Sequence, residues 1–274
     1  MAEQFQVDGD KTPASKSNDG VKHGGLFWLK AYTPPALIGV QGLSLCIYLS
    51  PHPRSLALGF LLFGIYLFEG MGILSPEDRI NQPQRFQFFK QHRKSALLLV
   101  GASLCLGLLL LWTLSPPFWR PSGALILSGI GFVLYVLFRW KVFGLLKPFL
   151  VSFSWVLALW GFSLIDFRGN EILYLGLFSL LFLDSLWLDL KDSPGDGAYG
   201  FNIKHLERGP MRRLFALHLF LAIFLGVLIG IKDPLFVCNG ILLISGVLGM
   251  KISSRWIHSL LVPVWSIYLL FVSI

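Results

Sequence analysis

The sequence predicts an all-α protein, a bundle of about nine membrane-spanning helices. Its composition is the first reason, because 54% of the residues are hydrophobic and only 14% are charged, whereas soluble domains carry about a quarter. The second reason is that apolar runs of about 20 residues, the length that crosses a bilayer as a helix, recur along the whole chain. The alternating polarity of a membrane β-barrel is absent, and helices satisfy their own backbone hydrogen bonds in lipid.

The apolar runs define the expected helices in chain order. They cover residues 26–49, 55–74, 96–114, 122–138, 148–165, 172–188, 214–231, 234–250 and 256–274. Residues 1–24 are polar and lack the apolar core of a signal peptide, so we expect a disordered tail before a single transmembrane domain over 25–274. Cys46, Cys105 and Cys238 lie within apolar runs without paired spacing, which favours small core residues over metal ligands.

Basic residues are concentrated on one side of the predicted bundle. The tail and the loops after the second, fourth, sixth and eighth helices hold 19 of the 23 lysines and arginines. The four on the other side are Arg54, Arg120, Arg168 and Lys232. By the positive-inside rule the N-terminus is cytoplasmic, in a plasma membrane such as the bacterial inner membrane. The net charge of +8 is thus explained by topology, and it gives no argument for a nucleic-acid partner.

A cluster of carboxylates follows the sixth apolar run. Asp189 and Asp192 are three residues apart and share a helix face, and Pro194-Gly195 is expected to bend the chain so that Asp196 turns back. Converging carboxylates repel one another unless a cation lies between them. An all-oxygen ligand set favours Mg²⁺, which bridges carboxylates to a substrate phosphate. A solvated acidic loop is the alternative, but this spacing in a chain of only 15 acids favours the metal site.

The segment LWLDLKDSPGDGAYGFNIKHLERG resembles the second aspartate-rich motif of the UbiA-type prenyltransferase superfamily. The family pattern, Asp-x-x-Asp-x-x-Gly-Asp-x-x-x-Gly, falls on Asp189, Asp192, Gly195, Asp196 and Gly200. Members of this family have nine helices, with this motif after the sixth on the cytoplasmic side. The resemblance implies a UbiA-like bundle that transfers a polyprenyl group from its diphosphate to a lipophilic, usually aromatic, acceptor.

The loop after the second apolar run differs from the family pattern. Family members have Asn-x-x-x-Asp-x-x-x-Asp there, whereas this chain has SPEDRINQPQRFQFFKQHRK. Asp78 takes the place of one aspartate and Asn81 supplies a neutral oxygen, but Gln82 stands where a second aspartate would be. Arg79 and Arg85 add guanidinium groups, which bind phosphate directly. This loop is therefore compatible with a site that has fewer metals and also with a protein that has lost catalysis.

The resemblance implies a full set of site residues. The metal-binding and catalytic residues would be Asp78, Asp189, Asp192 and Asp196, and the diphosphate would be contacted by Asn81, Arg79, Arg85, Arg139 and Lys141. Arg139 and Lys141 belong to VLYVLFRWKVFGLLKPF, which is similar to the Tyr-then-basic stretch of the family. Glu69 and Asp184 lie within apolar runs, where ionisable groups face a cavity or a partner. They are either contacts for the acceptor head group or neutral, hydrogen-bonded acids.

Together these observations predict Mg²⁺-dependent prenyl transfer in the membrane, with a polyprenyl diphosphate donor, a lipophilic acceptor and membrane lipid as partners. The alternative is a non-catalytic UbiA-like protein that binds lipid or assists assembly. A CDP-alcohol phosphotransferase needs Asp-Gly-x-x-Ala-Arg, but Asp196-Gly197 is followed by Ala198-Tyr199-Gly200. A transporter would be expected to show paired repeats with broken helices, which the apolar runs do not show.

Overall fold

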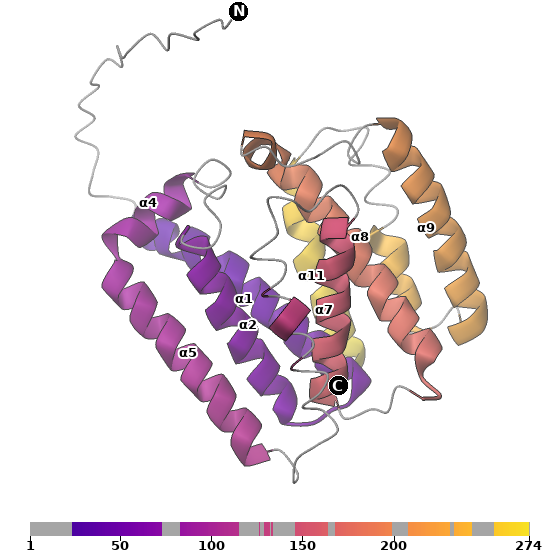
Figure 1. Cartoon of the computed structure of the whole chain (residues 1–274), viewed down its shortest axis with the longest axis horizontal. Helices are drawn as coiled ribbons and strands as arrows, with labels where there is room; N and C mark the ends of the chain where they lie inside the picture. The colour runs from indigo at the N-terminus through magenta and orange to yellow at the C-terminus, as the bar shows by residue number, and fades with distance from the viewer. Residues whose placement is uncertain are drawn as a thin grey trace, which may run out of the picture.

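The chain folds as a bundle of helices (Figure 1). The computed structural model describes residues 24–72, 83–114, 126, 129–131, 133, 146–163, 168–198, 208–230, 233–242 and 255–273. Every regular element within these ranges is helical, which confirms the all-α class. The predicted tail over 1–24 lies almost wholly outside the described residues.

The helices follow the apolar runs of the sequence closely. They are α1 (Gly24–Leu49), α2 (Arg54–Gly70), α4 (Pro83–Gln91), α5 (Arg93–Leu114), α7 (Leu146–Ser163), α8 (Glu171–Ala198), α9 (Arg208–Ile229) and α11 (Arg255–Ser273), with a further helical segment over 234–242. Seven of the nine expected ranges therefore coincide with a long helix. The expected helix over 122–138 lies mostly outside the described residues, and the one over 234–250 is described as far as 242.

Two expectations about loops are wrong. Helix α8 does not end at 188 but continues through Pro194 and Gly195 to Ala198. A proline inside a helix removes one backbone hydrogen bond and can kink the helix without ending it. The segment 75–95, expected as a loop, contains α4, whose Phe88 and Phe89 are buried against the bundle.

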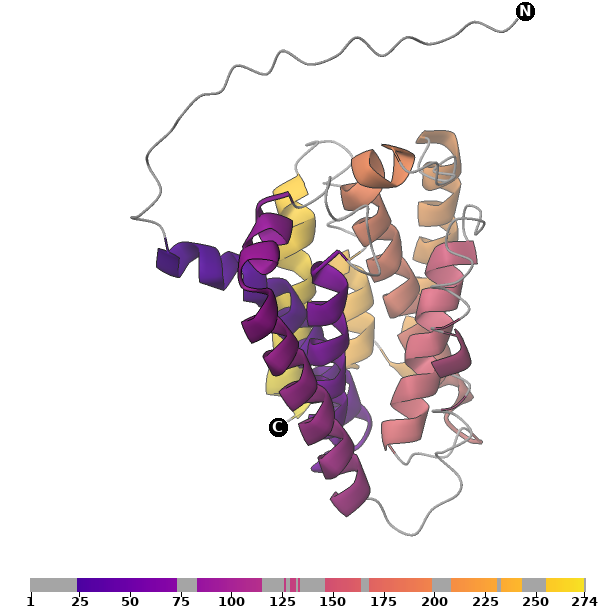
Figure 2. The ribbon, with the colours of Figure 1, turned by 60° about the vertical axis from the view of Figure 1, so that its left-hand side comes forward.

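Helix α1 lies at the centre of the packing. It contacts α2, α7 and α11, while α2 contacts α5, and α8 contacts α7, α9 and α11. Pro34 and Pro35 lie inside α1, and Figure 2 shows its first turns directed away from the rest of the helix. The closest approach of α1 and α2 is at Gly39 and Gly59, where a side chain on Gly39 would press on the Gly59 carbonyl oxygen.

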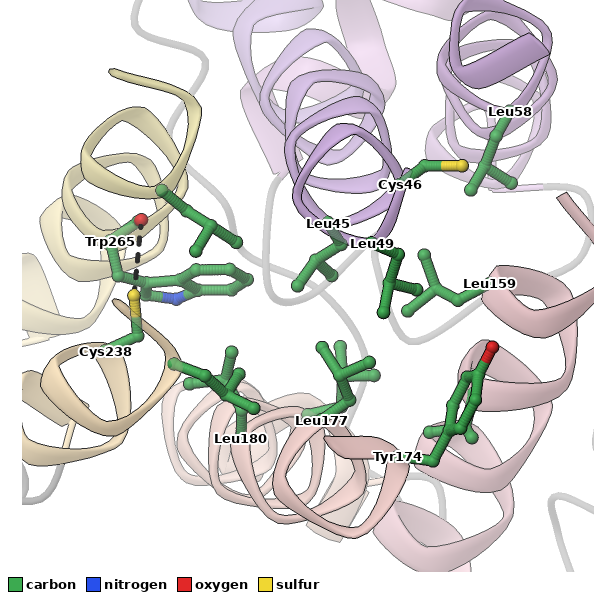
Figure 3. Close-up of a cluster of buried hydrophobic side chains, with 14 of the residues drawn as sticks. Leu45, Cys46, Leu49, Leu58, Leu159, Tyr174, Leu177, Leu180, Cys238 and Trp265 are labelled. Atoms are coloured by element: carbon green, nitrogen blue, oxygen red, sulfur yellow. Dashed lines mark hydrogen bonds between the residues drawn. The ribbon is translucent and has the colours of Figure 1, made fainter. Parts of the chain in front are cut away.

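The main core joins both halves of the chain. Figure 3 shows Trp265 of α11 beside Cys238, Leu180 and Leu45, so four separate segments meet around one indole ring. The Cys238 thiol donates to the carbonyl oxygen of Trp265 at 3.7 Å. This core fixes α1, α8 and α11 relative to one another, and these three helices carry the polar groups described below.

The outward faces of the flanking helices are strongly apolar. On α5, Leu98 and Trp112 are 75% and 72% exposed, and on α9, Phe220 and Val227 are 68% and 76% exposed. Within the described residues, α5 is the one helix long and apolar enough to cross a membrane by length and composition. Shorter apolar helical stretches lie at Leu146–Phe162 and Val264–Ser273.

Candidate functional site

Helix α8 carries the carboxylates on which the sequence prediction depends. Asp189, Asp192 and Asp196 fall at positions i, i+3 and i+7 of one continuous helix. At 3.6 residues per turn, these positions lie within about 60° of one another around the helix axis. The three residues therefore share a face of α8, although they share it through helical register and not through the predicted turn.

Asp184 lies deeper in the bundle and is almost fully buried. Its side chain is 4% exposed, and its Oδ2 accepts a hydrogen bond of 2.8 Å from the Gln41 side-chain amide of α1. The Trp265 indole of α11 lies beside the same carboxyl. Asp184 thus has a donor within the protein, and its role as a contact for an acceptor head group stays a prediction.

This cluster keeps unused hydrogen-bonding capacity. Asp184 Oδ1, Gln41 Oε1 and Trp265 Nε1 are all buried, and the indole N–H of Trp265 faces the Asp184 carboxyl, so Gln41 Oε1 is the atom of this cluster that has no donor. Two acceptors and one donor thus converge between α1, α8 and α11. A buried polar atom without a partner is costly, so such a grouping suits a ligand that carries a hydroxyl group.

Asp189 is held by a cation from the neighbouring helix. Lys147, in the first turn of α7, places its Nζ 2.7 Å from Asp189 Oδ1, and both side chains are mostly buried. Ion pairs that are removed from water are retained only when their geometry is good. The pair fixes the Asp-bearing end of α8 against α7 and puts a positive charge next to the proposed metal ligands.

Arg85 contacts the end of α2. Its Nη2 donates to the carbonyl oxygen of Tyr66 at 3.4 Å, and its guanidinium lies 5.7 Å from the centre of the Phe89 ring. A side chain added at Gly70 would overlap this guanidinium. Glu69 is half-buried on the same last turn of α2. Glu69 precedes the segment that contains Asp78 and Arg85 follows it, and both side chains lie at the end of α2.

Several predicted site residues lie outside the described part of the chain. These are Asp78, Arg79, Asn81, Arg139 and Lys141, and the side chains of Asp192 and Asp196 are also not described. Among the side chains that are described, no three His, Cys, Asp or Glu residues come together as metal ligands would. The position of Asp78 relative to Asp189 thus stays a prediction.

A second buried polar cluster, around Ser179, was not expected from the sequence. Ser179 of α8 lies 2.9 Å from His218 Nε2 of α9 and donates to Asn239 Oδ1 at 3.3 Å. The Asn239 amide in turn donates to the carbonyl oxygen of Leu235 at 2.9 Å. The Ser179 hydroxyl joins side chains from two other helical segments, and all three side chains are buried, so we assign the cluster to helix packing rather than to nucleophilic attack.

Sequence reasoning also missed Gln41, Lys147 and Trp265. Gln41 is a lone amide in an apolar run, which was a usable signal because uncharged polar groups within spans also need partners. In comparisons with known proteins, no protein-family model, no curated protein and no solved structure matches this chain.

Proposed function

We propose that the protein is a Mg²⁺-dependent prenyltransferase of UbiA type, embedded in a plasma membrane with its N-terminus in the cytoplasm. In the reaction, the bond between the allylic carbon and the diphosphate oxygen breaks, and its electron pair leaves with the diphosphate. A new bond forms between that carbon and an electron-rich carbon of a lipophilic acceptor, which then loses a proton.

The placement of the bundle in a membrane, with nine spans, is part of this proposal. Its support is the apolar outer surface of α5 and α9 together with a buried interior that holds Gln41, Asp184 and Asn239. In water such a surface would favour association or aggregation, whereas in lipid it is matched to its solvent. Helix α8, with 28 residues, is about 42 Å long and exceeds the hydrocarbon core of about 30 Å, so its aspartate-rich end would emerge from lipid.

The observation that carries the proposal is the order of carboxylates along α8. Asp189, Asp192 and Asp196 share one face at the helix end, and Asp184 lies about 7.5 Å further along the axis into the bundle. This order suits a donor whose charged diphosphate stays near the interface while its prenyl chain enters the apolar interior. The acceptor head group would then be held at Asp184, Gln41 and Trp265.

The residues fit a magnesium ion in chemistry, since Asp189, Asp192 and Asp196 offer oxygen ligands alone, and Asp78 would add one from the facing segment. When bound, Mg²⁺ supplies charge neutralisation to the diphosphate. Arg139, Lys141 and Arg85 would stabilise the negative charge that develops on the leaving group. Aromatic side chains of the interior would stabilise positive charge on the allylic carbon.

A non-catalytic UbiA-like role in lipid binding or assembly is the second candidate. Two observations favour it: Gln82 replaces an aspartate of the family pattern, and Asp189 already has a cationic partner in Lys147. In that role the carboxylates of α8 would stabilise the bundle without holding a metal.

The experiment that separates these candidates measures diphosphate release. Membranes that contain the protein are incubated with labelled allylic diphosphates of several chain lengths, with and without Mg²⁺. The enzyme releases diphosphate only with Mg²⁺, and membranes with Asp192→Asn do not. A scaffold protein gives the same background release in all four samples.

A further inference from the structure

The turn between α1 and α2 buries a cation that has no counter-charge among the residues that the structure describes. Arg54, the first residue of α2, is 1% exposed. Its Nε and Nη1 are buried without an acceptor, and the hydroxyl of the adjacent Ser55 is buried next to the Cys46 thiol. Two guanidinium nitrogens without an acceptor and a buried hydroxyl therefore lie together at one end of the bundle.

The neighbours of Arg54 do not balance its charge. Among the described residues, the group with an electrostatic effect on the guanidinium is the Cys46 thiol of α1, and Arg54 forms no ion pair with Asp or Glu. The imidazole of His52 accepts a hydrogen bond from the Arg54 backbone, 3.2 Å from Nδ1, so that nitrogen is used within the turn. Burial lowers the pKa of the guanidinium, yet arginine stays charged at neutral pH.

A buried charge without a partner is one of the least favourable features a folded chain has. Arginine forms short, paired hydrogen bonds with the oxygens of phosphate and carboxylate groups, and a serine hydroxyl donates one more. The turn in which α1 ends and α2 begins lies at one end of the bundle, and the Asp-bearing end of α8 lies at the opposite end (Figure 1). This site is therefore separate from the one proposed on α8.

We propose that Arg54 and Ser55 form an anion site for a phosphate group, carried either by a lipid head group or by free phosphate. Phosphate suits the site better than carboxylate because its tetrahedral oxygens accept from the guanidinium and the hydroxyl together. In the membrane orientation proposed above, the site lies at the non-cytoplasmic surface, where lipid head groups are at hand. An occupied site pairs the buried charge and stabilises the α1–α2 turn.

The test measures the melting temperature of the purified full chain in detergent. Four additions are compared: sodium phosphate, sodium chloride at equal ionic strength, dihexanoylphosphatidylglycerol, and dihexanoylglycerol, which lacks the phosphate. Because ligand that binds the folded state raises its stability, the phosphatidylglycerol raises Tm in a saturable manner and dihexanoylglycerol does not. A rise with sodium phosphate as well identifies the phosphate group alone as sufficient, and a rise with the lipid only identifies the lipid as its source.

Arg54→Met keeps side-chain length and removes the charge. It abolishes the ligand-dependent rise, or shifts half-saturation at least tenfold, and it leaves the ligand-free Tm equal to or above that of the parent because no cation is buried. Arg168→Met is the control, since Arg168 is exposed in another loop predicted on the same side, and it keeps the full ligand response. The proposal is overturned if neither phosphate compound raises the Tm of the parent, or if Arg54→Met responds as the parent does.

Discussion

The side-chain amide of Gln41 donates a 2.8 Å hydrogen bond to Asp184, a residue 143 positions later in the chain. Both side chains are buried, and the bond joins α1 to α8 inside the bundle. Asp184 is the one acid in the apolar run over 172–188, and this hydrogen bond places it at a contact between the two halves of the sequence. Polar contacts of this kind define how two helices are rotated relative to each other.

Removal of the donor alone should destabilise the protein. Gln41→Leu leaves the Asp184 carboxyl buried without its hydrogen bond, which costs about 1–3 kcal/mol. Thermal unfolding in detergent, followed by circular dichroism, measures the change. Replacement of both residues in Gln41→Leu/Asp184→Leu should recover most of the loss, because neither buried group then lacks a partner. Strictly additive losses in the double variant would show that the bond has no energetic role.

The contact between α1 and α2 should depend on a glycine. A Cβ on Gly39 would lie 2.9 Å from the carbonyl oxygen of Gly59, so Gly39→Ala forces the two backbones apart. We expect a loss of about 1–3 kcal/mol. Gly101→Ala on α5 is the matched control, since its Cβ meets open space, and it should be neutral or stabilising by up to about 1 kcal/mol. Equal melting temperatures for the two variants would contradict this close approach.

The cluster of Ser179, His218 and Asn239 should contribute to stability and not to ligand binding. His218→Leu removes the partner 2.9 Å from the Ser179 hydroxyl and should destabilise the protein by about 1–3 kcal/mol. Binding of a prenyl diphosphate analogue to the folded variant should equal that of the parent. A selective loss of this binding, with unchanged melting temperature, would mean that the cluster belongs to the substrate site.

Lys147 should weaken metal binding at the end of α8. Its ammonium group lies 2.7 Å from Asp189, so it repels a cation bound to the same carboxylate. Lys147→Gln should tighten Mg²⁺ binding by at least about tenfold, which is the Coulomb energy for the dielectric constant of water and therefore the smallest effect expected. Isothermal titration with Mg²⁺ measures it, and Lys94→Gln, at an exposed lysine of α5, serves as the control. Weaker Mg²⁺ binding in Lys147→Gln would assign Lys147 to the support of Asp189 instead.

The sequence was sufficient to predict seven of the nine expected helices within the described residues, because apolar runs of about 20 residues are longer than buried strands and are typical of helices. It was not sufficient at residue 188, where the apolar run ends but helix α8 continues. Hydropathy reports the surroundings of a segment, whereas the helix continues through Asp189 and Asp192 to Ala198 by its own backbone bonds.

The contacts of the candidate site depend on information that local patterns do not contain. The pairs Gln41–Asp184 and Lys147–Asp189 join different helices, and each depends on how far two helices are rotated about their axes. Trp265 was one of nine tryptophans in the sequence with nothing to distinguish it. The shared face of Asp189 and Asp192 was readable, since a spacing of three residues gives one face at any rotation, whereas Asp196 was expected beyond a bend and lies on the same helix.

The central claim is that the carboxylates of α8 hold Mg²⁺ for a diphosphate. The most direct measurement is the binding of a non-hydrolysable prenyl diphosphate analogue across a Mg²⁺ titration. The parent should bind more tightly as Mg²⁺ rises, Asp192→Asn should lose this dependence, and Arg85→Ala should bind more weakly while keeping it. Asp78→Asn should be intermediate. If Asp192→Asn binds the analogue as the parent does at every Mg²⁺ concentration, the carboxylates are not metal ligands and the non-catalytic role is correct.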